Sequence, residues 1–342
     1  MDWTWVDGAA LCVEGRGWRD TEGPFDRLPA RAKGRVREVI WNLSRHTTGV
    51  TVRFVTDAVE LRARWRLADP APGAVHTPLL AYSGLDLYAR EPAGRWRWVG
   101  VSNEVQGAAP ESSLTPWGRL APGRREYRLY LPVFNAVERL EIGVPAGAAV
   151  VAAAPRAERP VAYYGTSIVH GAGASRPGMT QAAILGRRLD YPLLNLGFAG
   201  NAHMEPEIAG LLAELDPAVY ILDPVPNMNA AAIAERAEAF VRTLSAARPG
   251  TPIVLVEDRT YPAAWLTPAV AEENRTRRQA FRRVFADLVA AGVAPMHYLE
   301  GDALLGWDGE GTNDGSHAND LGAMRMADAL EPVVRRALGL PV

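Results

Sequence analysis

The sequence predicts an α/β protein in two parts: an N-terminal antiparallel β-sandwich, jelly-roll-like, followed by a parallel sheet covered by helices. Residues 1–150 contain short segments of alternating apolar and polar residues, separated by Gly and Pro, as in antiparallel sandwiches. After an alanine-rich stretch at 146–160, non-alternating apolar runs take turns with helical stretches. This alternation of strands and helices is typical of a parallel sheet buried on both faces. We therefore expect a boundary near residue 155, with domains at 1–155 and 156–342.

The strands of the first part follow from period-two alternation, which points side chains in turn toward the core and toward solvent. They are expected at 50–57, 59–67, 85–90, 95–101, 127–133 and 137–144. Eight of the ten tryptophans lie in this part. The spacing of Trp96 and Trp98 predicts one exposed face, which leaves open both a sugar-stacking platform and ordinary core packing.

The second part is expected to contain five buried strands with helices between them. The strands are predicted at 161–165, 193–198, 219–223, 252–258 and 294–300, and the helices near 177–190, 204–215, 229–247, 268–291 and 320–338. In such a sheet, ligands and chemistry lie at the carboxyl ends of the strands. Candidate functional residues should therefore directly follow the apolar runs.

Composition excludes several classes of function. The 342 residues carry a formal net charge of −2, and Lys and Arg are spread along the chain, so no nucleic-acid partner is expected. No apolar run approaches the roughly 18–20 residues of a membrane helix, and no signal peptide is visible, so we expect a cytoplasmic protein, or a secreted one if a leader was trimmed. The single cysteine, Cys12, excludes an internal disulfide.

The stretch YYGTSIVHGAG (163–173) follows the first buried run and could hold a phosphate or expose Ser167 as a nucleophile. Gly171 and Gly173 begin a dinucleotide fingerprint, but Arg176 occupies its third glycine position, and no G-K-[ST] ending is present. A serine hydroxyl needs a base, usually a histidine oriented by a carboxylate. Asp314 and His317, in DGSH just before the last helix, supply such a pair.

Four blocks together resemble the SGNH, or GDSL-like, hydrolase family. They are GTS with Ser167, FAGN with Gly200, VPNM with Asn227 and DGSH, and they occur in the family order over about residues 158–340. The resemblance implies a flavodoxin-like three-layer α/β/α domain. Two positions depart from the family pattern, because Thr166 and Met228 stand where Asp is usual. GLDLY (84–88) looks like the signature of a β domain that precedes such hydrolases in bacteria.

The resemblance assigns the catalytic roles. Ser167 is the expected nucleophile, with a helix N-cap as the alternative reading. His317 is the expected general base, oriented by Asp314. The Ser167 amide, Gly200 and Asn227 are expected to form the oxyanion hole, although Gly200 and Asn227 also suit ordinary turns.

Further residues are candidates for contact with substrate. His170 could line the mouth of the site, although a solvated histidine at a helix start is the alternative, and His203 is similar. Tyr261 and Trp265 lie in a long connection of the kind that forms substrate walls, or they pack it onto the sheet. A calcium loop is a rival for the acidic residues around 308–314, but their spacing misses the calcium-loop pattern.

The expected function is a serine esterase that works through an acyl-enzyme, without a metal or organic cofactor. The first expected substrate is an acetyl ester of a carbohydrate or glycoside, and the only partner expected is a small-molecule or carbohydrate ester. General carboxylesterase, lipase-like, thioesterase and acyltransferase activities stay open. So does a non-catalytic glycan-binding role on a vestigial hydrolase fold. Acyl chain length, oligomeric state and the role of the β domain are left open by the sequence.

Overall fold

The computed structural model describes residues 2–70, 73–293 and 295–342. The chain forms two compact units, each built from separate stretches of sequence. Unit 1 contains the first segment up to Ala32, then Trp41–Ala157 and Ala174–Met179. Unit 2 contains Lys33–Ile40, Glu158–Gly173 and the chain from Thr180 onward.

Unit 1 is built on two antiparallel sheets, as expected. The four-stranded sheet has the order β1 (Trp3–Asp7), β9 (Val137–Pro145), β4 (Arg62–Leu67), β7 (Glu111–Ser113). The second sheet has the order β10 (Val150–Ala152), β3 (Thr51–Thr56), β8 (Arg125–Tyr130), β5 (Asp86–Arg90), β6 (Trp96–Val101), and β2 (Cys12–Glu14) pairs with β3. The strands β1, β2, β7 and β10 were not predicted, because three to five residues are too few to show a period. The short helices α1 (Glu38–Ser44) and α2 (Leu79–Ser83) were also not predicted, because seven and five residues make about two helical turns at most.

Alternation along the strands builds the core of unit 1. In β4, Ala63, Trp65 and Leu67 are buried, and the three arginines that alternate with them are exposed or half-buried. Side chains from both sheets, such as Phe54, Leu87 and Ile142, share one apolar core.

The GLDLY motif belongs to a buried polar cluster of unit 1. The Asp86 carboxylate, fully buried, accepts hydrogen bonds from Arg176 Nη1 (2.6 Å), Gly178 N (2.8 Å) and Trp98 Nε1 (2.9 Å). The Arg176 guanidinium also lies over the Trp98 ring, 5.1 Å from its centroid. Trp96 is buried and only Trp98 is substantially exposed, so these contacts favour a structural role for the pair over a sugar platform.

Replacing Asp86 with alanine is expected to destabilise unit 1 by roughly 3 kcal/mol, because it leaves the cation and two N–H donors without their acceptor. The measurement is thermal unfolding of the full chain. Glu138→Ala is the matched control, since it removes a half-exposed carboxylate paired with Arg66 and should cost about 0.5 kcal/mol or less. Equal effects of the two substitutions would contradict the assignment.

Unit 2 contains a five-stranded parallel sheet with the order β12 (Leu193–Gly197), β11 (Val161–Gly165), β13 (Val219–Asp223), β14 (Ile253–Val256), β15 (Met296–Leu299). The principal helices are α4 (Gln181–Leu189), α5 (Pro206–Glu214), α6 (Ala230–Ala247), α7 (Pro268–Ala290) and α8 (Asp320–Leu338). Each strand and helix predicted for this part is present. The helix predicted from residue 177 begins at Gln181, because Pro177–Met179 form a 3₁₀ turn.

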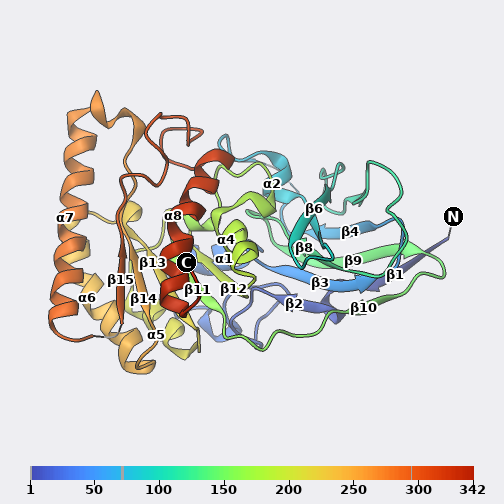
Figure 1. Cartoon of the computed structure of the whole chain (residues 1–342), viewed down its shortest axis with the longest axis horizontal. Coiled ribbons are helices and arrows are strands. Elements are labelled where there is room, and N and C mark those ends of the chain that lie inside the picture. The colour runs from blue at the N-terminus through green and yellow to red at the C-terminus, as the bar shows by residue number, and fades with distance from the viewer. Residues whose placement is uncertain (1, 71–72, 294) are drawn as a thin grey trace. The chain divides into compact units, whose positions relative to one another are not determined.

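Helices cover both faces of this sheet (Figure 1). On one face, Tyr163 of β11 shares a core with Leu185 of α4 and Leu330 of α8. On the other face, the ring of Tyr164 stacks on Phe240 of α6 at 5.2 Å. The predicted fold class is therefore confirmed. None of the helices in the described residues combines the length and apolarity that a membrane crossing requires.

Candidate active site

Ser167 lies at the turn between β11 and the short helix α3 (Ser167–His170). The turn is tight, because a Cβ on Gly165 would lie 2.5 Å from Val169 Cγ2 and 2.6 Å from Asp223 O. Thr166 is the N-cap, since its Oγ1 accepts a hydrogen bond from Ile168 N at 3.2 Å. Ser167 is therefore not the capping residue, and its hydroxyl is available to His317.

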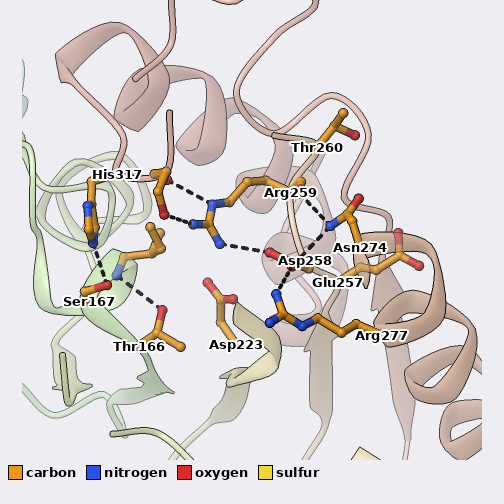
Figure 2. Close-up of polar contacts among 12 residues, drawn as sticks. Thr166, Ser167, Asp223, Glu257, Asp258, Arg259, Thr260, Asn274, Arg277 and His317 are labelled. Atoms are coloured by element: carbon orange, nitrogen blue, oxygen red, sulfur yellow. Dashed lines mark hydrogen bonds and ion pairs between the residues drawn. The ribbon is translucent and has the colours of Figure 1, made fainter. Parts of the chain in front are cut away.

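Ser167, His317 and Asp314 form a continuous hydrogen-bonded array (Figure 2 shows the Ser167–His317 contact). Ser167 Oγ lies 2.9 Å from His317 Nε2, and His317 Nδ1 lies 2.7 Å from Asp314 Oδ2. The other carboxylate oxygen of Asp314 accepts from the backbone N–H groups of His317 (2.8 Å) and Ser316 (2.9 Å). The structure thus joins residues that lie 150 positions apart in the chain.

The surroundings of Asp314 keep it ionised. Partial burial by itself would raise its pKa, but hydrogen bonds from the His317 and Ser316 backbone and from the His317 ring lower the pKa to about 2. An ionised Asp314 accepts a hydrogen bond from the Nδ1–H group of His317. Nε2 is then the ring nitrogen that can accept the Ser167 proton.

Gly200 and Asn227 lie in the loops after β12 and β13, the two neighbours of β11 in the sheet. Gly200 is exposed and has φ +70°, a conformation that favours glycine. Asn227 Oδ1 accepts a hydrogen bond from Ala202 N at 3.4 Å, so the two loops meet. This contact leaves Nδ2 as the end of the Asn227 amide that can donate to a substrate oxygen.

The weaker candidates have different environments. His170 is fully buried, so the expectation that it lines the mouth, or is solvated, is wrong. Its backbone packs so closely on β12 that a Cβ on Gly197 would lie 2.2 Å from His170 N. Trp265 is 84% exposed and available to a ligand, whereas Tyr261 lies under the Arg259 guanidinium at 4.7 Å.

Two acidic residues of the 308–314 loop, Asp308 and Asp314, have protein partners. Both carboxylate oxygens of Asp308 accept hydrogen bonds from Arg325 at 2.7 Å, and Asp314 is engaged by His317. These contacts do not favour the calcium loop considered as a rival.

A buried ion pair next to the loop of the DGSH block was not anticipated from the sequence. Arg259 and Asp258, at the end of β14, are 3% and 0% exposed, and Arg259 Nη1 donates to Asp258 Oδ1 at 2.8 Å. Arg259 also donates to Ser316, in the DGSH block. No motif marks this contact, because 57 residues separate Arg259 from Ser316.

The segment Lys33–Ile40 contributes a second unanticipated contact to unit 2. Arg37 donates to Asn201 Oδ1 (2.7 Å), to Asn201 O (2.9 Å) and to the Glu205 carboxylate. Arg37 therefore holds the loop after β12, which contains Gly200.

Asp223 is a buried carboxyl at the end of β13, drawn between Thr166 and Arg259 in Figure 2. Burial raises its pKa to about 8, against the opposing effect of the Arg259 charge. Tyr163 Oη donates to Asp223 Oδ2 at 3.3 Å. The folded protein therefore holds a proton on Asp223 at neutral pH that the unfolded chain releases.

Asp223→Asn is expected to flatten the pH dependence of stability. A pKa raised from 3.8 to about 8 means that the folded state binds more protons than the unfolded state between these values, so the free energy of unfolding falls as pH rises through this window. Asparagine does not titrate and removes this contribution. Denaturant unfolding at about pH 5 and about pH 8 measures the difference. Identical pH slopes in both proteins would contradict a protonated Asp223.

This fold and this array define a class. A sheet of flavodoxin-like strand order, with a Ser–His–Asp array at the carboxyl end of its strands, is the arrangement of a serine hydrolase acting on ester bonds. Residues 158–335 match the GDSL-like lipase/acylhydrolase family, and residues 2–150 match the GxDLY family, described as the N-terminus of SGNH-hydrolase-type esterases. The chain belongs to the GDSL-like lipase/acylhydrolase family.

Solved structures share the fold of this chain. A Bacteroides ovatus protein classed as a GDSL-like lipase is 30% identical over 99% of each chain, with a TM-score of 0.94. A salicylyl-acyltransferase of a tetracycline biosynthetic pathway shares the fold at 22% identity over 98% of each chain, with a TM-score of 0.78. A family two carbohydrate esterase from Clostridium thermocellum shares it at 14% identity over 85% of this chain and 93% of its own, with a TM-score of 0.60. No curated protein sequence matches the chain.

Proposed function

We propose that this protein hydrolyses a carboxylic ester through an acyl-enzyme on Ser167, and that its substrate is an acetyl ester of a carbohydrate or glycoside. The observation that carries the catalytic part is the array in which Ser167 Oγ lies 2.9 Å from His317 Nε2 and His317 Nδ1 lies 2.7 Å from Asp314. Distances within hydrogen-bond reach are what nucleophile activation requires.

In the first half-reaction, Ser167 Oγ attacks the ester carbonyl carbon while His317 Nε2 takes the hydroxyl proton. The carbonyl oxygen gains negative charge as the tetrahedral intermediate forms. The Ser167 amide, the Gly200 amide and Asn227 Nδ2 donate hydrogen bonds to this oxygen. The intermediate then collapses, the C–O bond to the alcohol breaks, and protonated His317 gives its proton to the leaving alcohol.

In the second half-reaction, water takes the place of the alcohol. His317 removes a proton from water, the resulting hydroxide attacks the acyl carbonyl, and the bond to Ser167 Oγ breaks. His317 then returns the proton to Oγ, and the acid leaves. Asp314, ionised throughout, stabilises the imidazolium in both halves. These steps require no metal or organic cofactor.

Two considerations support a sugar acetyl ester as the first substrate. The Clostridium thermocellum carbohydrate esterase shares the fold over most of both chains. The 84% exposed ring of Trp265, in the connection after β14, offers an aromatic face of the kind that stacks on sugars. An acyltransferase differs only in that an alcohol outcompetes water for the acyl-enzyme, and the salicylyl-acyltransferase shares the fold.

The test is a substrate panel. It comprises p-nitrophenyl esters of increasing acyl length, acetylated mono- and oligosaccharides, and acyl thioesters, each with and without an added acceptor alcohol. The proposal expects acetyl esters to have the highest kcat/KM, and acetylated sugars to release acetate. Preference for long acyl chains would indicate a lipase-like enzyme. New ester formation that exceeds hydrolysis would indicate an acyltransferase.

A non-catalytic glycan-binding protein is the alternative from another class. A fluorophosphonate that reacts with activated serines separates the two, because labelling needs the Ser167–His317 contact but not the correct substrate. Absence of both labelling and p-nitrophenyl acetate turnover in the wild-type protein would overturn the enzymatic proposal.

A further inference from the structure

We infer that Arg259 is a positioning residue, which holds His317 in line with Ser167 by gripping Ser316. This inference rests on the proposed function. Arg259 Nε donates to the Ser316 carbonyl oxygen at 3.0 Å, and Nη2 donates to Ser316 Oγ at 2.5 Å. One planar guanidinium thus contacts both the backbone and the side chain of a single residue.

Ser316 is the residue through which such a grip acts on the base. It immediately precedes His317, and its backbone N–H donates to Asp314 Oδ1 at 2.9 Å. The bonds of Asp314 described above stay within its own loop, so they fix the shape of the loop rather than its place in the domain. The contact with Arg259 ties that loop to the end of β14, the strand next to β13 in the sheet.

The arginine is itself held on its other side. Asp258 accepts from Arg259 Nη1 (2.8 Å) and from Asn274 Nδ2 (3.1 Å), and Arg277 Nη1 lies 3.5 Å from its second oxygen. Asn274 Nδ2 also donates to the Arg259 carbonyl oxygen at 3.0 Å. Asn274 and Arg277 lie on α7, so the Asp258–Arg259 pair that contacts Ser316 is fixed to a long helix of unit 2.

Burial makes this arrangement rigid. Arg259 and Asp258 are both buried. A buried ion pair keeps a fixed geometry, although it adds little to the free energy of unfolding. A displacement of about 1 Å between a base and its nucleophile lowers the rate by roughly 100-fold. A rigid bidentate contact one residue before the base provides that precision.

The test compares Arg259→Ala, Arg259→Lys and Ser316→Ala with wild type, normalised to titrated active sites. Arg259→Ala is expected to lower kcat by about 100-fold with little change in KM, and to slow fluorophosphonate labelling in parallel. Added guanidinium should restore part of the rate by filling the vacated site. Arg259→Lys keeps the positive charge but not the two parallel N–H donors of the guanidinium, so its kcat should stay close to that of Arg259→Ala. Ser316→Ala keeps the carbonyl contact and should show a smaller loss.

Arg282→Ala is the matched control. Arg282 forms an ion pair with Glu257, which is fully buried and adjacent to Asp258 in sequence, and the contact does not involve the DGSH loop. Its kcat should match wild type. If Arg259→Ala fails to fold, Arg259→Lys and Ser316→Ala carry the test. Variants that lose thermal stability but keep wild-type kcat per active site would overturn the inference, because that outcome is a purely structural role.

A second readout separates this inference from the proposed function. The low-field NMR resonance of the His317 Nδ1 proton, bonded to Asp314, reports the orientation of the ring without any substrate. The inference expects this resonance in wild type and Arg282→Ala, and its broadening or shift in the two Arg259 variants. An unchanged resonance in Arg259→Lys and Arg259→Ala would overturn the inference even in an active esterase. A protein inactive on every ester would instead fail the proposed function.

Discussion

Replacing Ser167 with alanine is expected to lower kcat for ester hydrolysis by about 10⁵-fold or more. Without Oγ no acyl-enzyme can form, because the hydroxyl is both the nucleophile and the source of the proton that His317 accepts. The residual rate comes from the oxyanion donors and from substrate binding alone. The measurement is p-nitrophenyl acetate turnover together with fluorophosphonate labelling, which should disappear completely.

Stability should be little affected by this change, because Thr166 rather than Ser167 caps α3. Ser245→Ala, on α6, is the control for a serine outside the site and should leave turnover unchanged. Activity that persists in Ser167→Ala but is lost on mutation of His317 would show that another nucleophile carries the reaction.

Asp314→Asn is expected to lower kcat by about 10⁴-fold at neutral pH. The amide can present an N–H to His317 Nδ1 in place of an acceptor, which favours the tautomer with the proton on Nε2. That tautomer cannot accept the proton of Ser167. The substitution also removes the negative charge that stabilises the imidazolium during acylation.

The pH profile gives this prediction a second readout. Because the pKa of Asp314 is about 2, its carboxylate stays ionised across the working range of an esterase. The acid limb of the wild-type profile should therefore not report protonation of Asp314. Asp328→Asn, an exposed carboxylate paired with Arg188, is the matched control and should behave as wild type. A decrease of less than about 10-fold in Asp314→Asn would exclude the assigned role.

Much of unit 2 could be predicted from the sequence, because the patterns that mark its strands and helices are local. A buried parallel strand is a short continuous apolar run, and β11 and β13 have the predicted bounds. The blocks around Ser167 and His317 were recognisable because the chemistry limits which residues can stand there. The contact between them was predicted only because both blocks fall at the same edge of the sheet.

The supporting contacts could not be predicted in the same way. Arg259 and Arg37 look like ordinary polar residues in the sequence, and each meets its partner only through the tertiary fold. His170 was misjudged because a histidine in a glycine-rich turn reads as exposed. The close approach of α3 to Gly197 instead encloses it. In unit 1, the short outer strands β1 and β7 gain their order from pairing with β9 and β4 rather than from their own pattern.

The membership of Lys33–Ile40 in unit 2 has a consequence for protein engineering. The hydrolase half of the chain cannot be transferred as one continuous segment. The loop after β12 is held by Arg37, which lies more than 160 positions earlier in the sequence. In a chimaera with its crossover near residue 157, residues 33–40 would come from the other parent. The loop after β12 would then lie against a segment that does not match it or that lacks the arginine. Functional chimaeras within this family should therefore inherit residues 33–40 from the same parent as the hydrolase half.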